Sequence, residues 1–428
     1  MDTTASWIER DAAVVWHGFT QMSCYADNQP LIVERAEGRE LIDVDGKRYL
    51  DAISSLWVNT LGHHVPELDA ALRDQIDRVA HTTMLGNGNR IVIEFAEALA
   101  ARVPVDGAHI LFAADGASAV EQALKIAFQY WTNRAIAGRT TYLAFGDAYH
   151  GDTVGSLSVG SGGFGTDVFD PLRFPVLRAP SFAHPDALDI AASMVVENSQ
   201  QLAAVIVEPY VQGAAGMLIA DPARFGALAL ACQDHDVLLI CDEVAVGFGR
   251  TGTLFASEQC GLRPDLLCVG KGIAGGYLAM SATIASAKVF EAFSGPDLSD
   301  RTLYHGHSFG GNALAAAVAL RHLALIDEWD VLANVNARSA QLSARLAAVQ
   351  ELAVVRDVRI AGLIAGVELH SAPGERLARR ICAAMVRRGV LTRSLGDVIT
   401  IVPPLTITAT EIDLIVDTLL AATHEVCA

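Results

Sequence analysis

The chain has 428 residues, which is more than one compact hydrophobic core accommodates, so two packed units are expected. Hydrophobic residues make up 52% of the chain and charged residues 19%, a balance that favours a large buried core. The formal net charge of -18 argues against nucleic acid or an anionic membrane as a partner, because both are themselves negatively charged. Composition therefore predicts an acidic enzyme that binds small molecules.

The seven cysteines are odd in number, include no Cys-x-x-Cys pair, and in several cases lie inside apolar runs. These features predict reduced, buried thiols in a cytoplasmic protein. The first 18 residues carry charges and lack an apolar block, so no signal peptide is predicted. Apolar runs elsewhere are broken by glycine or charge before they reach about 18 residues, so we predict no membrane span.

The N-terminal part contains the aromatic stretch WHGFTQM, at residues 16–22, and a predicted hairpin. Residues 31–52 hold an Asp-Gly pair at 45–46 between runs of alternating polarity, which is a strong hairpin signal. The adjacent His63 and His64 lack a third ligand at metal-binding spacing. We therefore expect a structural or pocket-wall role for them and no metal site.

From about residue 90 the pattern alternates between strands and helices, which predicts an α/β domain. Residues 94–103 are predicted as helix and residues 109–113 as strand. The turn at residues 115–118 then opens another helix, and a glycine-bearing turn at a helix N-terminus is typical of a phosphate site. By itself this motif is weak, since Asp and Ser are ordinary helix caps.

Two further predicted strands end in polar segments. Residues 141–145 form one strand, which is followed by the loop GDAYHGDT at residues 146–153. Residues 204–207 form the other, which ends at Glu208. A strand-end loop with a tyrosine, a histidine and two aspartates suits an active site, although a capped turn has the same composition.

The stretch from residue 237 to residue 276 carries the strongest chemical signal. Residues 237–240 and 266–269 are apolar runs short enough for fully buried strands. Asp242 comes soon after the first run, and Lys271 follows the second between two glycines. Because ligands bind at the carboxyl ends of strands in an open α/β sheet, two parallel strands would bring this carboxylate and this amine into one crevice.

Such a pair suits pyridoxal phosphate as a cofactor. A lysine binds this cofactor covalently, and a carboxylate keeps its pyridine nitrogen protonated so that the ring draws off electrons. Taken singly, an aspartate at a strand end is more often a helix cap, and a lysine is more often a surface charge. The combination of Asp242, Lys271 and the GFGRTG turn at residues 247–252 favours the cofactor.

Beyond about residue 326 the pattern changes to a smaller α+β unit. Its predicted helices cover residues 331–349, 375–388 and 409–422, and its predicted strands lie near residues 354–357, 363–369 and 398–401. Arg393 lies between a short strand and a glycine turn, a place where an arginine is usually a surface charge.

The pattern LLIxDEVxxGFGRTG, with a lysine 29 residues after the aspartate (271 − 242), resembles the class III (subgroup II) aminotransferases, which are pyridoxal-phosphate enzymes of fold type I. The resemblance covers nearly the whole chain. It implies a large domain with a mostly parallel seven-stranded sheet plus a smaller α+β domain. In the implied division, residues 61–325 form the large cofactor-binding domain, residues 326–428 form the small domain, and the hairpin-bearing residues 1–60 join the small domain.

The same resemblance implies roles for individual residues and a homodimer with shared active sites. The expected catalytic residues are Lys271, Asp242 and Tyr149, the last stacked on the pyridine ring. The expected cofactor-binding residues are Lys271, Asp242, Gly116, Ala117, Ser118, Tyr149, His150, Glu208, Val244 and Ser308. Among them, Val244 packs on the other face of the ring, and Ser308 reaches the phosphate of the neighbouring subunit's cofactor.

Five stretches resemble one branch of the family in particular: WHGFTQM, DAISSLWVNTLGHH, QALKIAFQYW, AYHGDTVGSLSVG and the C-terminal VPP. This branch makes 7,8-diaminononanoate from 8-amino-7-oxononanoate in biotin biosynthesis, usually with S-adenosylmethionine as amino donor. The substrate-binding residues that it implies are Phe19, Trp57, Tyr149, Asp152, Arg250, Gly306 and Arg393. The forked donors of Arg393 suit a substrate carboxylate.

The chain departs from the branch at four positions, where Gly18 replaces a proline, Phe19 a tyrosine, Leu56 a tryptophan and Ala117 a serine. With Ala117 in place, a phosphate contact must come from the backbone or from Ser118. At the other phosphate turn, Ser308 replaces the more usual threonine and keeps a hydroxyl donor. Because relatives with phenylalanine at the position of Phe19 include users of lysine, the departures bear on the amino donor more than on the reaction.

Three alternatives remain beside this interpretation. An aminotransferase for ω-amino acids and pyruvate, or for 4-aminobutyrate, shares Asp242, Lys271 and Glu208, but the WHGFTQM start and Arg393 count against it. A non-catalytic protein on the same scaffold would have lost Lys271 or Asp242, and both are present. An NAD-binding protein needs a glycine motif between a strand and a helix, and GSGGFG at residues 160–165 lacks that context.

Overall fold

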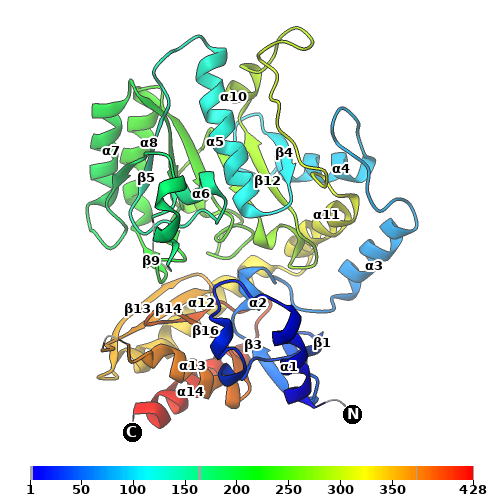
Figure 1. Ribbon diagram of the computed structural model, residues 1–428, viewed down its shortest axis with the longest axis vertical. Coiled ribbons are helices and arrows are strands. Elements are labelled where there is room, and N and C mark those ends of the chain that lie inside the picture. The colour runs from blue at the N-terminus through cyan, green and yellow to red at the C-terminus, as the bar shows by residue number, and fades with distance from the viewer. Residues whose placement is uncertain (1–2, 162–164, 373, 428) are drawn as a thin grey trace.

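The computed structural model describes residues 3–161, 165–372 and 374–427 (Figure 1). The middle of the GSGGFG stretch, residues 162–164, lies outside these residues. Figure 1 shows a larger α/β body above a smaller α+β body, with both chain ends at the smaller one. Within the described residues, no helix is both long and apolar enough to cross a bilayer.

A seven-stranded sheet forms the centre of the larger body, in the order β4-β12-β11-β10-β7-β5-β6. Its strands are β4 (His109–Ala113), β5 (Thr141–Phe145), β6 (Leu177–Ala179), β7 (Leu202–Val207), β10 (Leu238–Asp242), β11 (Leu266–Val269) and β12 (Ser281–Ala285). Only β12 runs against its neighbours in this sheet, pairing antiparallel with both β11 and β4. The predicted mostly parallel seven-stranded sheet is therefore confirmed.

Both faces of this sheet are covered, which explains why its strands read as unbroken apolar runs. Leu238 and Ile240 of β10 pack in the same core cluster as the buried face of α5. Leu239 and Cys241 face the opposite cluster, which contains residues of α7 and α8. The helices of the larger body are α3 (Pro66–Ile76), α4 (Arg90–Ala100), α5 (Gly116–Asn133), α6 (Val154–Val159), α7 (Ala187–Asn198), α8 (Phe225–Asp234), α9 (Ala256–Gln259), α10 (Ala287–Glu291) and α11 (Ala313–Glu328).

The smaller body contains two four-stranded sheets, β13-β14-β17-β16 and β1-β2-β3-β15. Its strands are β1 (Val33–Glu37), β2 (Glu40–Asp43), β3 (Arg48–Asp51), β13 (Val355–Ala361), β14 (Ile364–Leu369), β15 (Val390–Leu391), β16 (Arg393–Leu395) and β17 (Val398–Ile401). Its helices are α1 (Thr4–Val14), α12 (Val331–Gln350), α13 (Leu377–Arg387) and α14 (Ala409–Cys427), and the short α2 (Ser54–Trp57) lies where the two bodies meet. A separate pair, β8 (Val211–Gln212) and β9 (Leu218–Ile219), completes the strands.

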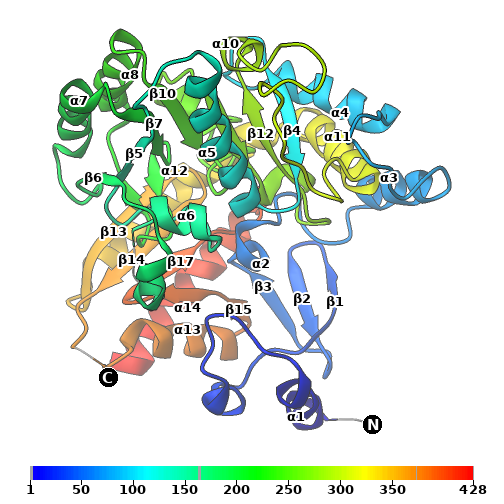
Figure 2. The same cartoon turned by 45° about the horizontal axis from the view of Figure 1, so that its top comes forward.

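The N-terminal segment joins the C-terminal part through the parallel pairing of β15 with β3 (Figure 2). The predicted hairpin is confirmed, because β2 and β3 pair antiparallel across a turn in which Gly46 has a φ of 83°. The proposed division at residues 60/61 and 325/326 stays a prediction, and its second boundary falls inside α11.

Some predicted boundaries were wrong by a few residues. Helix α4 begins at Arg90 because Asn89 caps it by accepting from the N–H of Ile91, and it ends three residues before the predicted end at residue 103. Helix α14 continues five residues past its predicted end at residue 422. Strand β10 includes Asp242 as its last residue, whereas the predicted strand ended at residue 240. Five of the seven cysteines are buried free thiols as predicted, while Cys24 and Cys427 are exposed.

Candidate active site

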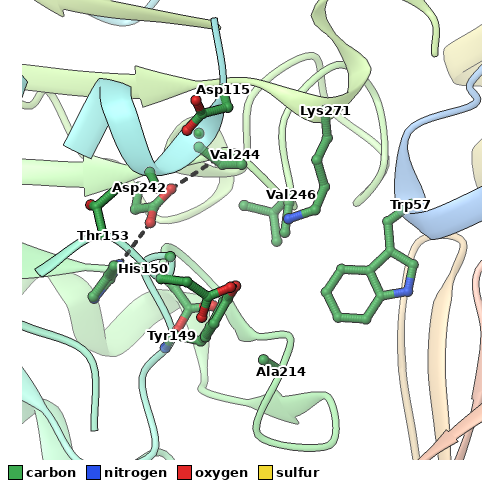
Figure 3. Close-up of a pocket in the computed structure, with 16 residues that line it drawn as sticks. Trp57, Asp115, Tyr149, His150, Thr153, Ala214, Asp242, Val244, Val246 and Lys271 are labelled. Carbon is green, nitrogen blue, oxygen red and sulfur yellow. Dashed lines mark hydrogen bonds and ion pairs between the residues drawn. The ribbon is translucent and has the colours of Figure 1, made fainter. Parts of the chain in front are cut away.

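The neighbouring strands β10 and β11 end at the same edge of the large sheet. They pair in parallel, with Asp242 level with Cys268, and Lys271 follows two residues after the end of β11. Asp242 and Lys271 line one cavity of about 480 Å³, facing each other across it (Figure 3). The predicted crevice with a carboxylate and an amine is therefore present, and its volume suits a small organic cofactor.

Asp242 forms the floor of the cavity and is only 5% exposed. One carboxylate oxygen, Oδ2, lies 2.7 Å from Nδ1 of the buried His150, and Oδ1 accepts a hydrogen bond from the N–H of Val244 at 3.0 Å. Figure 3 shows both contacts, which fix the plane of the carboxylate. A buried carboxylate held in this way favours a positive partner such as a protonated ring nitrogen.

Lys271 has a left-handed backbone, with a φ of 33°, a conformation that a residue with a side chain seldom adopts. Burial lowers the pKa of its amine, while the negative charges of Asp242 and Glu208 act in the opposite direction. A lowered pKa leaves more of the amine neutral, which is the nucleophilic form. The glycine before it is closely packed, because a Cβ at Gly270 would lie 3.3 Å from a methyl group of Val244.

Glu208 and Tyr149 form a second polar group in the cavity wall. Glu208 accepts hydrogen bonds from the N–H groups of Tyr149 and Gly213, each at 3.2 Å. Burial raises the pKa of Glu208 to about 7. The Tyr149 hydroxyl donates to Asp152 at 3.0 Å, and burial raises the pKa of this phenol, so it stays protonated.

The N-terminus of α5 forms the end of the cavity where a phosphate group fits. Asp115 caps the helix by accepting from both the N–H and the hydroxyl of Ser118, each at 2.9 Å. The hydroxyl of Ser118 is thus directed to Asp115, which leaves the backbone N–H groups of Gly116 and Ala117 as the donors toward the cavity. Glycine is required at 116, because a Cβ there would lie 2.6 Å from Val244.

Ten of the predicted site residues line the cavity together: Trp57, Gly116, Ala117, Tyr149, His150, Asp152, Glu208, Asp242, Val244 and Lys271. Sequence reasoning missed six others: Asp115, Gly151, Thr153, Ala214, Ala245 and Val246. A signal existed for most of them, since Ala245 and Val246 directly follow Val244, and Gly151 and Thr153 belong to the polar loop already singled out. Ala214 carried no such signal, because an alanine in a loop has no distinctive chemistry.

Arg250 was predicted to bind substrate, and that role stays a prediction; the residue does not line the cavity. Its side chain is 2% exposed, and Nη1 donates to the carbonyl oxygens of Leu363 at 3.1 Å and Pro403 at 2.5 Å. Burial lowers the pKa of the guanidinium to about 9. Because its donors are directed at backbone carbonyls of the smaller body, Arg250 connects the two bodies and does not line the cavity.

Four more predicted residues, Phe19, Gly306, Ser308 and Arg393, are exposed and do not line this cavity. Phe19 is 67% exposed, and Arg393 is the first residue of β16. Their roles stay predictions.

The residues of the cavity fit pyridoxal phosphate. Asp242 is a buried carboxylate for the ring nitrogen, Lys271 lies opposite it, and the first turn of α5 offers backbone donors for the phosphate. Tyr149 and Val244 are placed on the cavity wall, where each can cover one face of a flat ring.

Comparison with known proteins agrees with this chemistry. The sequence pattern of the family described as aminotransferase class III matches residues 22–423. The chain is 43% identical to the adenosylmethionine-8-amino-7-oxononanoate aminotransferase of Nitratidesulfovibrio vulgaris (strain Hildenborough), over 98% of this chain and 82% of that protein.

Solved structures give the same grouping. The adenosylmethionine-8-amino-7-oxononanoate aminotransferase of Methanocaldococcus jannaschii superposes with a TM-score of 0.95 at 36% identity, covering 98% of each chain. The omega transaminase of Pseudomonas jessenii in complex with PMP superposes with a TM-score of 0.91 at 27% identity, also over 98% of each chain.

Proposed function

The chain belongs to the class III aminotransferases, and from this premise we propose that it transfers an amino group to 8-amino-7-oxononanoate, giving 7,8-diaminononanoate in biotin biosynthesis. Its cofactor is pyridoxal 5'-phosphate. The observation that carries the proposal is that a cavity with Lys271 opposite Asp242 occurs in a chain 43% identical, over 98% of its length, to a protein named for this reaction.

In this proposal the cavity residues hold the cofactor at three points. Asp242 keeps a proton on the ring nitrogen, the N-terminus of α5 binds the phosphate, and Lys271 forms the covalent link. When bound, the cofactor supplies a carbonyl that takes up the amino group and a ring that withdraws electrons. His150 and the N–H of Val244 orient the Asp242 carboxylate toward the ring nitrogen in this proposal.

Lys271 also moves the proton. Burial lowers the pKa of its amine and so favours the neutral form, which can take a proton from the substrate carbon that carries the amino group. Trp57 lies beside it, with the Lys271 Nζ 5.3 Å from the centroid of the indole ring. This aromatic wall keeps water from that side of the amine.

The charges of the cavity favour substrates that carry a positive charge. Of the four carboxylates that line it, Asp242 serves the ring nitrogen, Asp115 caps α5 and Glu208 has a raised pKa, which leaves the carboxylate of Asp152 for a positively charged group. S-adenosylmethionine, lysine and 8-amino-7-oxononanoate all carry an amine. Both amino donors, S-adenosylmethionine and lysine, therefore suit this charge.

We further propose a homodimer in which Phe19, Gly306, Ser308 and Arg393 serve a complete site formed with a second copy. Apolar side chains are exposed in the two segments that carry Phe19, Gly306 and Ser308. The exposed fractions are 89% for Trp16, 67% for Phe19 and 63% for Phe309. Large exposed apolar groups concentrated in this way are typical of a subunit interface. The cytoplasmic location expected from the cysteines stays a prediction.

A coupled assay tests the substrate. With S-adenosylmethionine or lysine as donor, we expect amino transfer to 8-amino-7-oxononanoate at a higher kcat/KM than to pyruvate or 2-oxoglutarate. Mixing the holoenzyme with each donor alone, and following the absorbance of the bound cofactor, identifies the donor. A preference for pyruvate would instead support the ω-amino acid alternative.

A further inference from the structure

The segment between β3 and α2 has a backbone that its residues do not favour. Ser54, Ser55 and Trp57 have φ values of 51°, 60° and 64°, in the left-handed region, although none of them is a glycine. Such conformations are unfavourable for residues with a side chain and persist only where surrounding contacts hold them. The structure shows which contacts do this.

Asp51 is the centre of these contacts and is 0% exposed. Its Oδ1 accepts from the N–H of Ile53 at 3.2 Å, and its Oδ2 accepts from the N–H of Ser55 at 2.8 Å. His63 Nε2 lies 3.0 Å from the same Oδ2. One buried carboxylate thus bonds the backbone of the left-handed Ser55, the backbone of Ile53 just before the positive-φ residues, and one side chain beyond them.

A second set of contacts ties this segment to the smaller body. The Ser54 hydroxyl donates to the carbonyl of Val402 at 2.6 Å, and the N–H of Val402 donates to the carbonyl of Ala52 at 2.8 Å. Arg250 donates to the carbonyl of the adjacent Pro403 at 2.5 Å. The segment is therefore fixed both by its own carboxylate and by the strand end that follows β17.

Trp57 is the residue that this arrangement delivers to the active site. It is 7% exposed and lies at the end of the cavity next to the Lys271 amine (Figure 3). Its ring also packs on Gly213, where a Cβ would lie 3.1 Å from the indole. Among the described residues, its Nε1 has no hydrogen-bond partner, so packing and the backbone alone determine where the indole lies.

We propose that Asp51 is a positioning residue for the reaction, which acts by holding Ser54, Ser55 and Trp57 at the positive φ angles that place Trp57 against Lys271. Asp51 itself does not line the cavity. The proposal rests on the proposed function only in taking Lys271 as the cofactor lysine. It predicts that removing the Asp51 carboxylate lowers activity and changes the surroundings of the cofactor, whereas removing another buried carboxylate of the same body lowers only stability.

Asp43 provides a matched control. It is a buried aspartate on the adjacent strand β2, 9% exposed, and accepts from the N–H groups of Asp45 at 3.0 Å and Lys47 at 2.9 Å. It also accepts from the Tyr49 hydroxyl at 2.8 Å, so it too bonds two backbone groups and one side chain. It holds the hairpin turn and does not line the cavity.

The experiment compares Asp51→Ala and Asp51→Asn with Asp43→Ala and Asp43→Asn as holoenzymes. Both alanine variants should lower the thermal unfolding midpoint. Only Asp51→Ala should lower kcat/KM, by about 10²-fold for a misplaced active-site group. Only the Asp51 variants should change the absorbance spectrum of the bound cofactor. Asp51→Asn keeps one acceptor oxygen and should give a smaller loss.

A double-mutant cycle with Trp57→Ala tests whether Asp51 acts through the indole. In the Trp57→Ala background, Asp51→Asn should cause no further loss of kcat/KM, whereas the effect of Asp43→Asn should be the same in both backgrounds. Fully additive effects of Asp51→Asn and Trp57→Ala would overturn the inference, as would equal activity losses in the Asp43 and Asp51 variants. A wild-type protein that binds no pyridoxal phosphate would instead overturn the assignment of Lys271.

Discussion

The floor of the cavity and the outer segments at residues 14–19 and 304–309 are built in opposite ways. The floor consists of strand ends, and its side chains are buried and bonded to one another, as the contact of Asp242 with His150 shows. The outer segments present Trp16 and Phe309 to solvent, at 89% and 63% exposure. The floor is thus bonded within one chain, whereas the exposed side chains of the outer segments are left for the second chain of the proposed dimer to cover.

This contrast separates two kinds of residue. Floor residues carry the chemistry that every class III aminotransferase needs, so their loss should affect the reaction itself. In the proposed dimer, residues of the outer segments complete the site of the second copy, so their loss should affect affinity and should depend on assembly. Substitutions in the floor should therefore have larger effects than substitutions in the outer segments.

Lys271→Ala should lower kcat by at least about 10³-fold, because it removes both the covalent link to the cofactor and the amine that moves the proton. It should also abolish the visible absorption of the lysine-bound cofactor. Steady-state kinetics and an absorption spectrum measure the two effects. Lys288→Ala is the control, since Lys288 pairs with Asp236 on the surface, and its removal should leave both unchanged. Normal turnover by the Lys271 variant would contradict the assignment.

Asp242→Asn and Glu243→Gln compare two buried carboxylates that are neighbours in sequence. Asp242 faces the cavity, whereas Glu243 accepts from the N–H groups of Ala256 at 2.6 Å and Ser257 at 2.8 Å and so caps α9. Asp242→Asn should lower kcat by about 10²-fold or more with little change in unfolding free energy. Glu243→Gln should destabilise the protein by about 1–2 kcal/mol with little change in kcat. Kinetics and urea denaturation of both variants check this, and equal kinetic losses would contradict it.

The sequence predicted the floor well because its physical basis is local. Runs such as residues 266–269 are fully apolar and are followed within two residues by a polar one, so strand, burial and site position follow from a few residues. Parallel pairing then brings Asp242 and Lys271 together without further information. The loop after β5 was found for the same reason, since it follows a buried strand directly.

The left-handed segment and Arg250 could not be predicted in this way. The sequence Ser54-Ser55-Leu56-Trp57 contains no glycine, and its backbone depends on Asp51 and on the carbonyl of Val402, which lies 348 residues away from Ser54. Arg250 likewise finds its partners only when the two bodies meet. Its motif resembles a substrate-binding one, and its contacts with Leu363 and Pro403 come from tertiary packing that the motif does not encode.

The free energy of unfolding should depend on pH through Glu208, a carboxyl group in the wall of the cavity. Burial raises the pKa of Glu208 to about 7, above its ordinary value of 4.5, so the folded state binds a proton more tightly than the unfolded state. Its contribution to the free energy of unfolding is therefore fully present below about pH 4.5 and is lost as pH rises through about 7. Glu208→Gln removes this dependence.

Between pH 5 and pH 8, the wild type should consequently lose about 1–3 kcal/mol more unfolding free energy than Glu208→Gln does. Denaturant unfolding at the two pH values measures the change. The two proteins are compared by the change in unfolding free energy between the two pH values, so a pH-independent destabilisation by the Glu208→Gln substitution does not affect the result. Glu243, whose pKa burial also raises to about 7, contributes with the same sign in both proteins and cancels. Parallel losses in wild type and variant would contradict the prediction.

The smallest effects should come from the outer segments, at Ser308. If its hydroxyl bonds the phosphate of a cofactor in the second subunit, Ser308→Ala should weaken cofactor binding by about two- to tenfold, the range of one hydrogen bond. Ser308→Thr keeps the hydroxyl and should bind within about twofold of wild type. Absorbance titration with pyridoxal phosphate measures both. Because the contact needs the partner chain, the difference between Ser308→Ala and wild type should disappear at protein concentrations low enough for the dimer to dissociate. A difference that persists in the monomer would place Ser308 at the site of its own chain. The floor and the outer segments would then both belong to one chain's site, and the distinction between them would be lost.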